Sequence, residues 1–224
     1  WPGVMVRRIE ALTGATAAFF NGAIGDVGPR ITNGRTMGDI HYVEELGGVA
    51  AQDATRILKS VTQYTDGDIK CVTGAVSIPL KKRIPLEEAQ EKLKACIKSK
   101  YADEVALKRY YGEVVQSYEA GAEEQESHLE EQVLLRVGNL VFVAFAYELF
   151  SEISLRIQKE CKNLVVLPLS IANGYTSYFP TQSQLCRGGY EVGMFRTTKL
   201  QEYVDDADYR LICETLKNIE KVKD

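Results

Sequence analysis

The stretch "VGNLVFVAFAYELF", residues 137–150, decides the fold of this chain. Its centre, Leu140–Ala146, is an unbroken apolar run that follows a Gly-Asn pair and ends at Tyr147 and Glu148. Apolar runs of this length, rich in β-branched and aromatic residues, are typical of strands that are buried on both faces. The Gly-Asn pair favours a tight turn, so we expect a hairpin with the preceding strand.

The segments on either side of this run also have the spacing of strands. The preceding strand is predicted to alternate through Leu129, Val133, Leu135 and Val137. Farther from the run, "NLVVLPLSIA" (163–172) is a second buried strand. A strand over 72–80 turns Val72, Val76, Ile78 and Leu80 one way, and Pro79 within it predicts an edge position in the sheet.

Helical spacing accounts for most of the remaining chain. A short buried strand, "TAAFFNGAIGD" (16–26), is expected to run into a glycine-rich turn. Strands that alternate with helices, together with one hairpin, predict an α/β fold with a mixed β-sheet flanked by helices. The predicted helices cover residues 2–13, 39–61, 84–100, 103–119, 148–160 and 204–222.

Composition excludes several classes of protein. The chain has 224 residues, 45% of them hydrophobic, and a formal net charge of −4, which argues against a nucleic-acid surface or a polybasic membrane anchor. Its apolar runs are too short to span a bilayer. Five cysteines without CxxC spacing indicate reduced thiols and a cytoplasmic location. Because the chain opens in helical pattern at Trp-Pro-Gly, we expect it to lack the first part of its natural protein.

Three loops share one design, in which a buried strand ends in glycine, tyrosine or an acidic residue. They are "FFNGAIGDVGP" (19–29), "FVAFAYELF" (142–150) and "LSIANGYTSYFP" (169–180). Ligand sites in open α/β sheets form beyond the carboxyl ends of the strands, so these loops are predicted to converge on one site.

The residues in these loops have two interpretations each. Glu148 is either a carboxylate favoured by a helix N-terminus or a metal ligand or acid–base group. Asp26 is either the acceptor of an Asx-type turn or part of the site. The rings of Tyr175, Tyr178 and Tyr190 either pack with one buried hydroxyl or line a pocket. His41 and His128, the two histidines, have no partner at metal-ligand spacing.

In this order, the three loops resemble those of the neutral/alkaline non-lysosomal ceramidases and their shorter bacterial relatives. "NGAIGDVGP" (21–29) is similar to the family's Gly-Asp loop, and "LVFVAFAYELFSEI" (140–153) to a strand that ends at a glutamate before a helix. The match is most specific at "SIANGYTSYFPTQSQLCRGGYEV" (170–192), with its Asn, Tyr, Tyr-x-Pro-Thr and Gly-Gly-Tyr-Glu. The resemblance extends over nearly the whole chain, which would be the C-terminal part of the catalytic domain.

The resemblance implies a zinc-dependent amide hydrolase with one zinc ion held by two histidines, a glutamate and a tyrosine. On the matching positions, Glu148 and Tyr178 are the expected zinc ligands, and Tyr178 and Tyr190 are the expected catalytic residues. The family's two zinc histidines are expected before Trp1. The resemblance also implies that substrate contacts come from Gly25, Asp26, Gly28, Asn173 and Tyr190.

Two positions depart from the family pattern. Gly28 stands where ceramidases place a serine, and Ala146-Tyr147 replaces Pro-Gly before the glutamate, where the bulky Tyr147 is expected to narrow the pocket. The expected partner is thus a small-molecule amide or a sphingolipid-like substrate. With half of the zinc site, this chain by itself is predicted to be inactive. Two alternatives remain: a binding module that kept the scaffold without catalysis, and a zinc hydrolase of a small soluble amide.

Overall fold

The computed structural model describes residues 1–29, 38–64, 67–96 and 102–223, except for the side chains of residues 102–105. The chain divides into two compact units. Residues 1–21 and 27–67 make the first unit, and residues 22–26 and 68–224 make the second. The end of the helix predicted over 84–100 lies outside the described residues.

The first unit is a pair of packed helices, α1 (Pro2–Thr13) and α2 (Ile40–Ser60). Helix α1 ends at Gly14, which takes the left-handed conformation that favours glycine (φ 70°). Asp39 caps α2 by accepting a hydrogen bond from the backbone N–H of His41. The strand predicted over 16–26 is absent from this described stretch, where Phe19 and Phe20 are exposed and no ladder forms. The prediction was based on apolar composition, but a strand also needs a neighbouring strand to accept its backbone hydrogen bonds.

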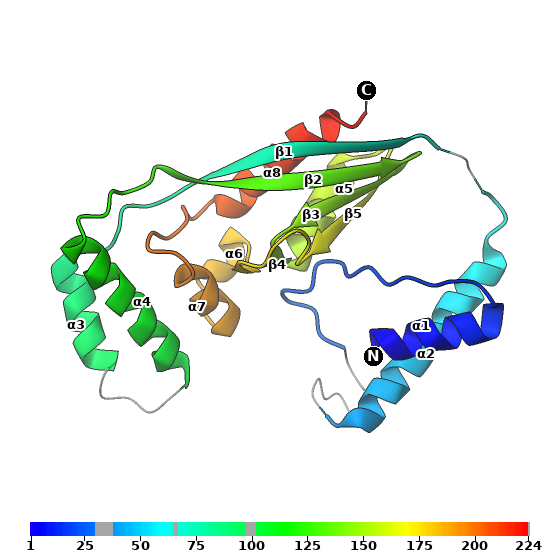
Figure 1. The fold of residues 1–224 in the computed structure, drawn as a ribbon, viewed down its shortest axis with the longest axis horizontal. Helices are drawn as coiled ribbons and strands as arrows, with labels where there is room; N and C mark the ends of the chain where they lie inside the picture. The colour runs from blue at the N-terminus through cyan, green and yellow to red at the C-terminus, as the bar shows by residue number, and fades with distance from the viewer. Residues whose placement is uncertain (30–37, 65–66, 97–101, 224) are drawn as a thin grey trace. The chain divides into compact units, whose positions relative to one another are not determined.

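The second unit is built on a four-stranded mixed sheet with the order β1-β2-β3-β5 (Figure 1). The first three strands are antiparallel, and β3 and β5 are parallel. A separate parallel pair, β4 and β6, follows the ends of β3 and β5. The strands are β1 (Ile69–Pro79), β2 (Ser127–Val137), β3 (Leu140–Phe145), β4 (Tyr147–Leu149), β5 (Val165–Ser170) and β6 (Ser177–Phe179).

Two helices pack against the sheet, and two others form a hairpin that connects its two longest strands along the chain. Helices α5 and α8 pack against each other and against the sheet, while α3 and α4 pack as a hairpin between β1 and β2 (Figure 1). None of the described helices is long and apolar enough to cross a membrane. The helices are α3 (Leu86–Cys96), α4 (Ala102–Glu119), α5 (Ser151–Glu160), α6 (Gln182–Leu185), α7 (Tyr190–Arg196) and α8 (Ala207–Glu220).

This architecture confirms the predicted α/β fold with a mixed sheet flanked by helices. The hairpin at Gly138 is confirmed, and β1, with Pro79 at its end, lies at the sheet edge as expected. The phase of β2 was predicted wrongly. Leu129 is 68% exposed, whereas Leu134 is fully buried. The core face of β2 also carries Gln132, which is buried and donates a hydrogen bond to Thr215 on α8. The predicted alternation had placed this polar residue on the solvent face.

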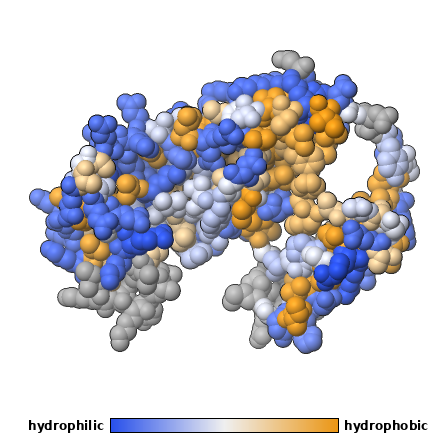
Figure 2. All heavy atoms as spheres, in the orientation of Figure 1, coloured by the Kyte–Doolittle hydropathy of each residue, from blue (hydrophilic) through white to orange (hydrophobic). Residues whose placement is uncertain are grey.

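The other face of the sheet is also largely apolar. Strand register places Ile69 and Val137 side by side on this face, next to Leu140 and Val165 on the following strands. Ile69 and Val165 are exposed, and apolar side chains gather over the sheet in Figure 2. The apolar runs thus reflect strands that carry apolar side chains on both faces.

Three buried tyrosines make the fold sensitive to alkali. Burial raises the pKa of Tyr110 to about 12 and raises the pKa of both Tyr147 and Tyr203, whose hydroxyls lie 3.2 Å apart in the core. The neutral phenol is the form that folding favours. Its contribution is therefore complete below the unfolded pKa of about 10 and is lost as the pH rises through the folded pKa.

We therefore expect the free energy of unfolding to stay level from about pH 8 to about pH 9 and to fall as the pH rises from about 10 toward 12. Urea unfolding followed by circular dichroism measures this change. Tyr110→Phe, which removes one of the responsible hydroxyls, should reduce the loss, while Tyr64→Phe at an exposed position should leave it unchanged. A free energy of unfolding that stays constant over this range would contradict the prediction.

Candidate functional site

Strands β4 and β6 bring a carboxylate and a phenol together. They pair in parallel with Glu148 opposite Tyr178, so the two side chains project from the same face. The flanking residues point the other way: Tyr147 and Leu149 on β4, and Phe179 on β6, are buried in the core. Because side chains alternate along both strands, the buried residues fix the strands in the core, and Glu148 and Tyr178 lie half-buried at the surface.

Two further rings complete the cluster. The ring of Tyr190, at the start of α7, meets that of Tyr178 edge to face, with 5.8 Å between centroids. Burial raises the pKa of Tyr178 to about 12, and the negative charge of Glu148 contributes after it. The pKa of Tyr175 is raised by the same causes in the same order. Tyr175 therefore lies near Glu148 too; its Tyr-x-x-Tyr spacing to Tyr178 is the sequence signal for it.

The position of Glu148 differs from the prediction. The helix expected from residue 148 begins at Ser151, and Glu148 lies in β4 instead. The backbone N–H of Leu149 donates to Ser170 Oγ (3.1 Å) rather than entering a helix. Interaction with a helix N-terminus is therefore the wrong explanation for Glu148. Tyr147 was expected to narrow the pocket, but its ring packs in the core, 4.7 Å from that of Phe179.

The Gly-Asp loop supports β4 and α5 directly. The N–H of Gly25 donates to Leu149 O (2.8 Å), and Asp26 accepts from both the N–H (2.6 Å) and the hydroxyl (3.0 Å) of Ser151. Helix α5 has no side-chain cap of its own at Phe150. Asp26 thus caps it from a distant part of the sequence, which neither the Asx-turn nor the substrate-contact interpretation had included.

Removing this cap should destabilise the second unit. We expect Asp26→Ala to lower the free energy of unfolding by about 1–2 kcal/mol, because the backbone N–H and the hydroxyl of Ser151 lose their acceptor. Asp26→Asn, which keeps one oxygen, should cost less. Urea unfolding measures both, and an alanine variant as stable as the natural chain would show that the cap is idle.

The remaining predicted substrate contacts lie in different surroundings. Asn173 is exposed in the loop after β5 with a φ of 63°, and the preceding Ile171 has a φ of 53°, which is strained for a β-branched residue. Backbone hydrogen bonds from Ile171 to Tyr147 O and from Thr176 to Ala146 O fasten this loop to the end of β3 and to β4. Gly28 is exposed and belongs to the first unit. Both substrate-contact assignments stay predictions.

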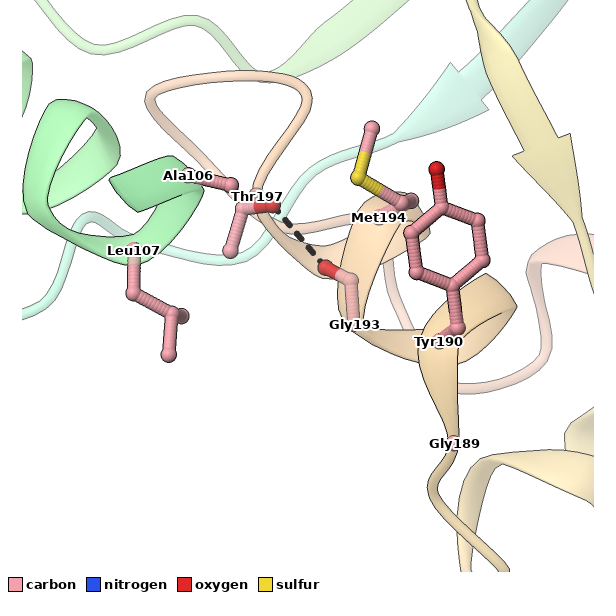
Figure 3. Close-up of a pocket in the computed structure, with 7 residues that line it drawn as sticks. All are labelled: Ala106, Leu107, Gly189, Tyr190, Gly193, Met194 and Thr197. Carbon is pink, nitrogen blue, oxygen red and sulfur yellow. Dashed lines mark hydrogen bonds between the residues drawn. The ribbon is translucent and has the colours of Figure 1, made fainter. Parts of the chain in front are cut away.

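A hollow of about 530 Å³ adjoins the cluster at Tyr190 (Figure 3). Helix α7 forms one wall and α4 the other, and the lining is mostly apolar. The hydroxyl of Thr197 donates to Gly193 O, so its hydrogen is already used within α7 and is not offered to a ligand. The lining residues are Ala106, Leu107, Gly189, Tyr190, Gly193, Met194 and Thr197.

The described residues fit only part of a zinc site. No group of three or more His, Cys, Asp or Glu side chains within the described ranges is arranged to hold a metal ion. Catalytic zinc ordinarily takes three protein ligands. Glu148 and Tyr178 supply two oxygen donors. His128 instead lies 3.7 Å from Glu130, and His41 is exposed on α2.

Comparison with known proteins supports a fold relationship only. No protein-family model and no curated protein matches the chain. Solved structures do match, among them a neutral ceramidase from Pseudomonas aeruginosa (TM-score 0.60, 16% identity) and a ceramidase complexed with C2 (TM-score 0.61, 14% identity). Each match covers 98% of this chain but only 40% and 42%, respectively, of the ceramidase chain. The chain therefore has the fold of part of a ceramidase, which confirms the resemblance seen in the sequence.

Proposed function

We propose that this chain is the C-terminal portion of a ceramidase-like hydrolase domain, which cleaves an amide into an acid and an amine. The observation that carries the proposal is the pairing of Glu148 with Tyr178 across β4 and β6. These are the two positions that the family resemblance assigns to zinc. Two side chains thirty residues apart in the sequence would then serve one centre.

The proposal requires ligands from elsewhere. Glu148 and Tyr178 would hold one side of a zinc ion, and two histidines before Trp1 would complete the site. Bound zinc would polarise the amide carbonyl and activate water. The exposed apolar residues Ile69 and Val165 on the second face of the sheet support a larger domain, because exposed apolar surface of this kind normally packs against another layer. The ceramidase chains, more than twice as long as the matched region, support it as well.

The residues of this chain would orient the substrate and stabilise the charge that develops during the reaction. Glu148 would contribute negative charge beside the reacting carbonyl. Tyr178, which lies opposite Glu148 across the strand pair, would also donate a hydrogen bond from its phenol to the oxygen on which charge develops. Tyr190 would border the reacting group, and the apolar hollow beside it would take an apolar part of the amide. An N-acyl amide or ceramide fits this division into a polar and an apolar half.

A non-catalytic binding module is the second candidate. The specific observation in its favour is that the described residues bring only two oxygen donors together, one short of the usual three protein ligands. Such a module would keep the aromatic cluster and bind a ligand without turnover. It differs from the hydrolase in one measurable respect, namely the stoichiometric retention of zinc by the complete protein.

The experiment compares the longest natural polypeptide that contains this chain with three variants. Zinc content and hydrolysis of a fluorescent N-acyl amide are measured together. Glu148→Gln should lose most bound zinc and at least about 100-fold in activity, because a neutral amide replaces an anionic ligand. Tyr178→Phe should lose both properties to a smaller extent. Glu160→Gln, an exposed change at the far end of α5, is the matched control.

Two results would contradict the hydrolase. The first is a Glu148→Gln protein that retains zinc and activity. The second is appreciable amide hydrolysis by the 224-residue chain alone, because that chain should lack two ligands. A complete protein that never retains zinc would leave the binding module as the better description.

A further inference from the structure

The two walls of the apolar hollow rest on separate clusters of buried residues. Helices α3 and α4 pack together around Ala89, Tyr110 and Val114, which form a cluster distinct from the core of the sheet. Helix α7 belongs to the core of the sheet through Phe195. Figure 3 shows side chains of α4 on one side of the hollow and those of α7 on the other. The width of the hollow therefore depends on how the α3–α4 hairpin is attached to the rest of the second unit.

Gln201 fastens both ends of this hairpin. Its side chain is buried, and its Nε2 donates to Lys81 O and to Gln125 O, each at 2.8 Å. Its Oε1 accepts a hydrogen bond from the backbone N–H of Gln125 (2.7 Å). Lys81 lies between β1 and α3, and Gln125 lies between α4 and β2. One amide group thus binds the segment that enters the hairpin and the segment that leaves it.

Arg83 extends this attachment into α4. Its buried guanidinium donates hydrogen bonds to Ser117 Oγ (2.7 Å) and to Ala122 O, and it lies over the ring of Tyr118, 4.6 Å from the centroid. Ser117 and Tyr118 are in the last turn of α4. These contacts join the base of the hairpin to α4, so a shift of the base is passed on to the wall that α4 contributes to the hollow.

The segment that carries Gln201 is also bonded to the other wall. The hydroxyls of Thr197 and Thr198 donate to Gly193 O (2.9 Å) and Met194 O (2.6 Å), which belong to two residues that line the hollow on α7. Gln201 follows three positions later. The same short segment therefore contacts α7 at one end and, through Gln201, the hairpin at the other. A change at Gln201 alters the spacing of the two walls without replacing any residue of the lining.

We propose that Gln201 is a positioning residue, which sets the width of the hollow and thereby the shape of the apolar group that binds there. The volume of about 530 Å³ is within the range of ligand pockets, about 300–1,000 Å³. The residues that line it are uncharged and mostly aliphatic. Such a space between two helices at a fixed distance favours an unbranched aliphatic chain, because a broad ring system must push the walls apart. This inference rests on the proposed function where it concerns turnover, whereas binding itself requires neither zinc nor amide cleavage.

The binding experiment titrates the 224-residue chain with two fluorescent carboxylates, cis-parinarate, which has an unbranched chain, and pyrenebutanoate, which has a broad ring system. We expect the natural chain to bind cis-parinarate at least about tenfold more tightly. In Gln201→Met, which keeps the length of the side chain but removes its hydrogen bonds, this preference should fall to within about threefold. Gln201→Ala should lower it at least as far, and circular dichroism checks that both variants fold.

Two further variants separate this role from a general loss of stability. Gln158→Ala removes a hydrogen bond of the same kind, from Gln158 Nε2 to Val166 O (3.0 Å), between α5 and β5. It should leave the preference for cis-parinarate unchanged. Gly193→Leu should weaken binding of both probes at least about tenfold, because Gly193 lines the hollow and a Cβ atom there meets nothing within 4 Å.

Two binding results would refute the inference. An unchanged preference in Gln201→Met would show that the hydrogen bonds of Gln201 do not set the width of the hollow. Full binding of both probes by Gly193→Leu would place them outside the hollow.

A separate measurement of turnover uses the longest natural polypeptide that contains this chain. Its substrates are the N-dodecanoyl and N-pyrenebutanoyl amides of one fluorogenic amine. Gln201→Met should raise KM for the first at least about fivefold and change kcat less than about twofold. Hydrolysis with an unchanged KM would refute the positioning role alone. Absence of hydrolysis by the natural protein would refute the proposed hydrolase, while the preference measured by binding would still support the role of Gln201.

Discussion

Gly25→Ala is expected to destabilise the second unit by about 3 kcal/mol or more, at the upper end of the cost of overpacking a buried position. A Cβ atom at Gly25 would lie 2.3 Å from Glu148 O and 2.9 Å from Leu149 O. Both are backbone atoms of β4, which is held between β6 and the Gly-Asp loop. Because no flexible side chain can move aside, β4 itself must shift, and the carboxylate of Glu148 shifts with it.

Gly22→Ala is the matched control for this prediction. Gly22 lies three residues earlier in the same loop, and a Cβ atom there meets nothing within 4 Å. An alanine at an open glycine position costs little or stabilises by about 0.4–1 kcal/mol through the unfolded state. Urea unfolding measures both variants. Equal stability of the two variants would show that the Gly25 loop does not lie against β4.

The fold class could be predicted because, at its key residues, the structure favoured by the local sequence pattern is the one that the tertiary contacts also favour. The run after Gly138 became β3 because its apolar residues are buried on one face and lie on an apolar surface on the other. Pro79 marked an edge strand because proline cannot donate a backbone hydrogen bond to a neighbouring strand. Both the apolar run and the proline are local features of the sequence, so they can be recognised without knowing which distant residues they contact.

The candidate site was harder to predict because its geometry depends on distant partners. The pairing of Glu148 with Tyr178 joins two strands of three residues each, too short for a period of two to be recognised. The bond from Ser151 to Asp26 spans 125 positions, so local spacing could not show that Asp26 caps α5. The residue types of the site were thus visible in the sequence, whereas their contacts required the fold.

Phe179→Ala is expected to have the other large effect, a loss of about 3–5 kcal/mol in the free energy of unfolding. The ring of Phe179 is fully buried in an aromatic cluster. Its centroid lies 4.7 Å from that of Tyr147, 5.2 Å from Phe195 and 5.6 Å from Tyr203. Truncation removes all three ring contacts and leaves a cavity behind β6.

The consequences for the site follow from the length of β6. A two-stranded sheet of three-residue strands is marginal by itself, so the packing of Phe179 is what keeps Tyr178 next to Glu148. Hydrogen exchange should therefore quicken most at β4 and β6 in Phe179→Ala, with a smaller acceleration at β1 and β2. Tyr178→Ala, on the opposite face of the same strand, is the control and should cost less than about 1.5 kcal/mol. Uniform acceleration across both sheets would show instead that the aromatic cluster supports the whole unit, and that the strand pair carrying the site has no separate stability.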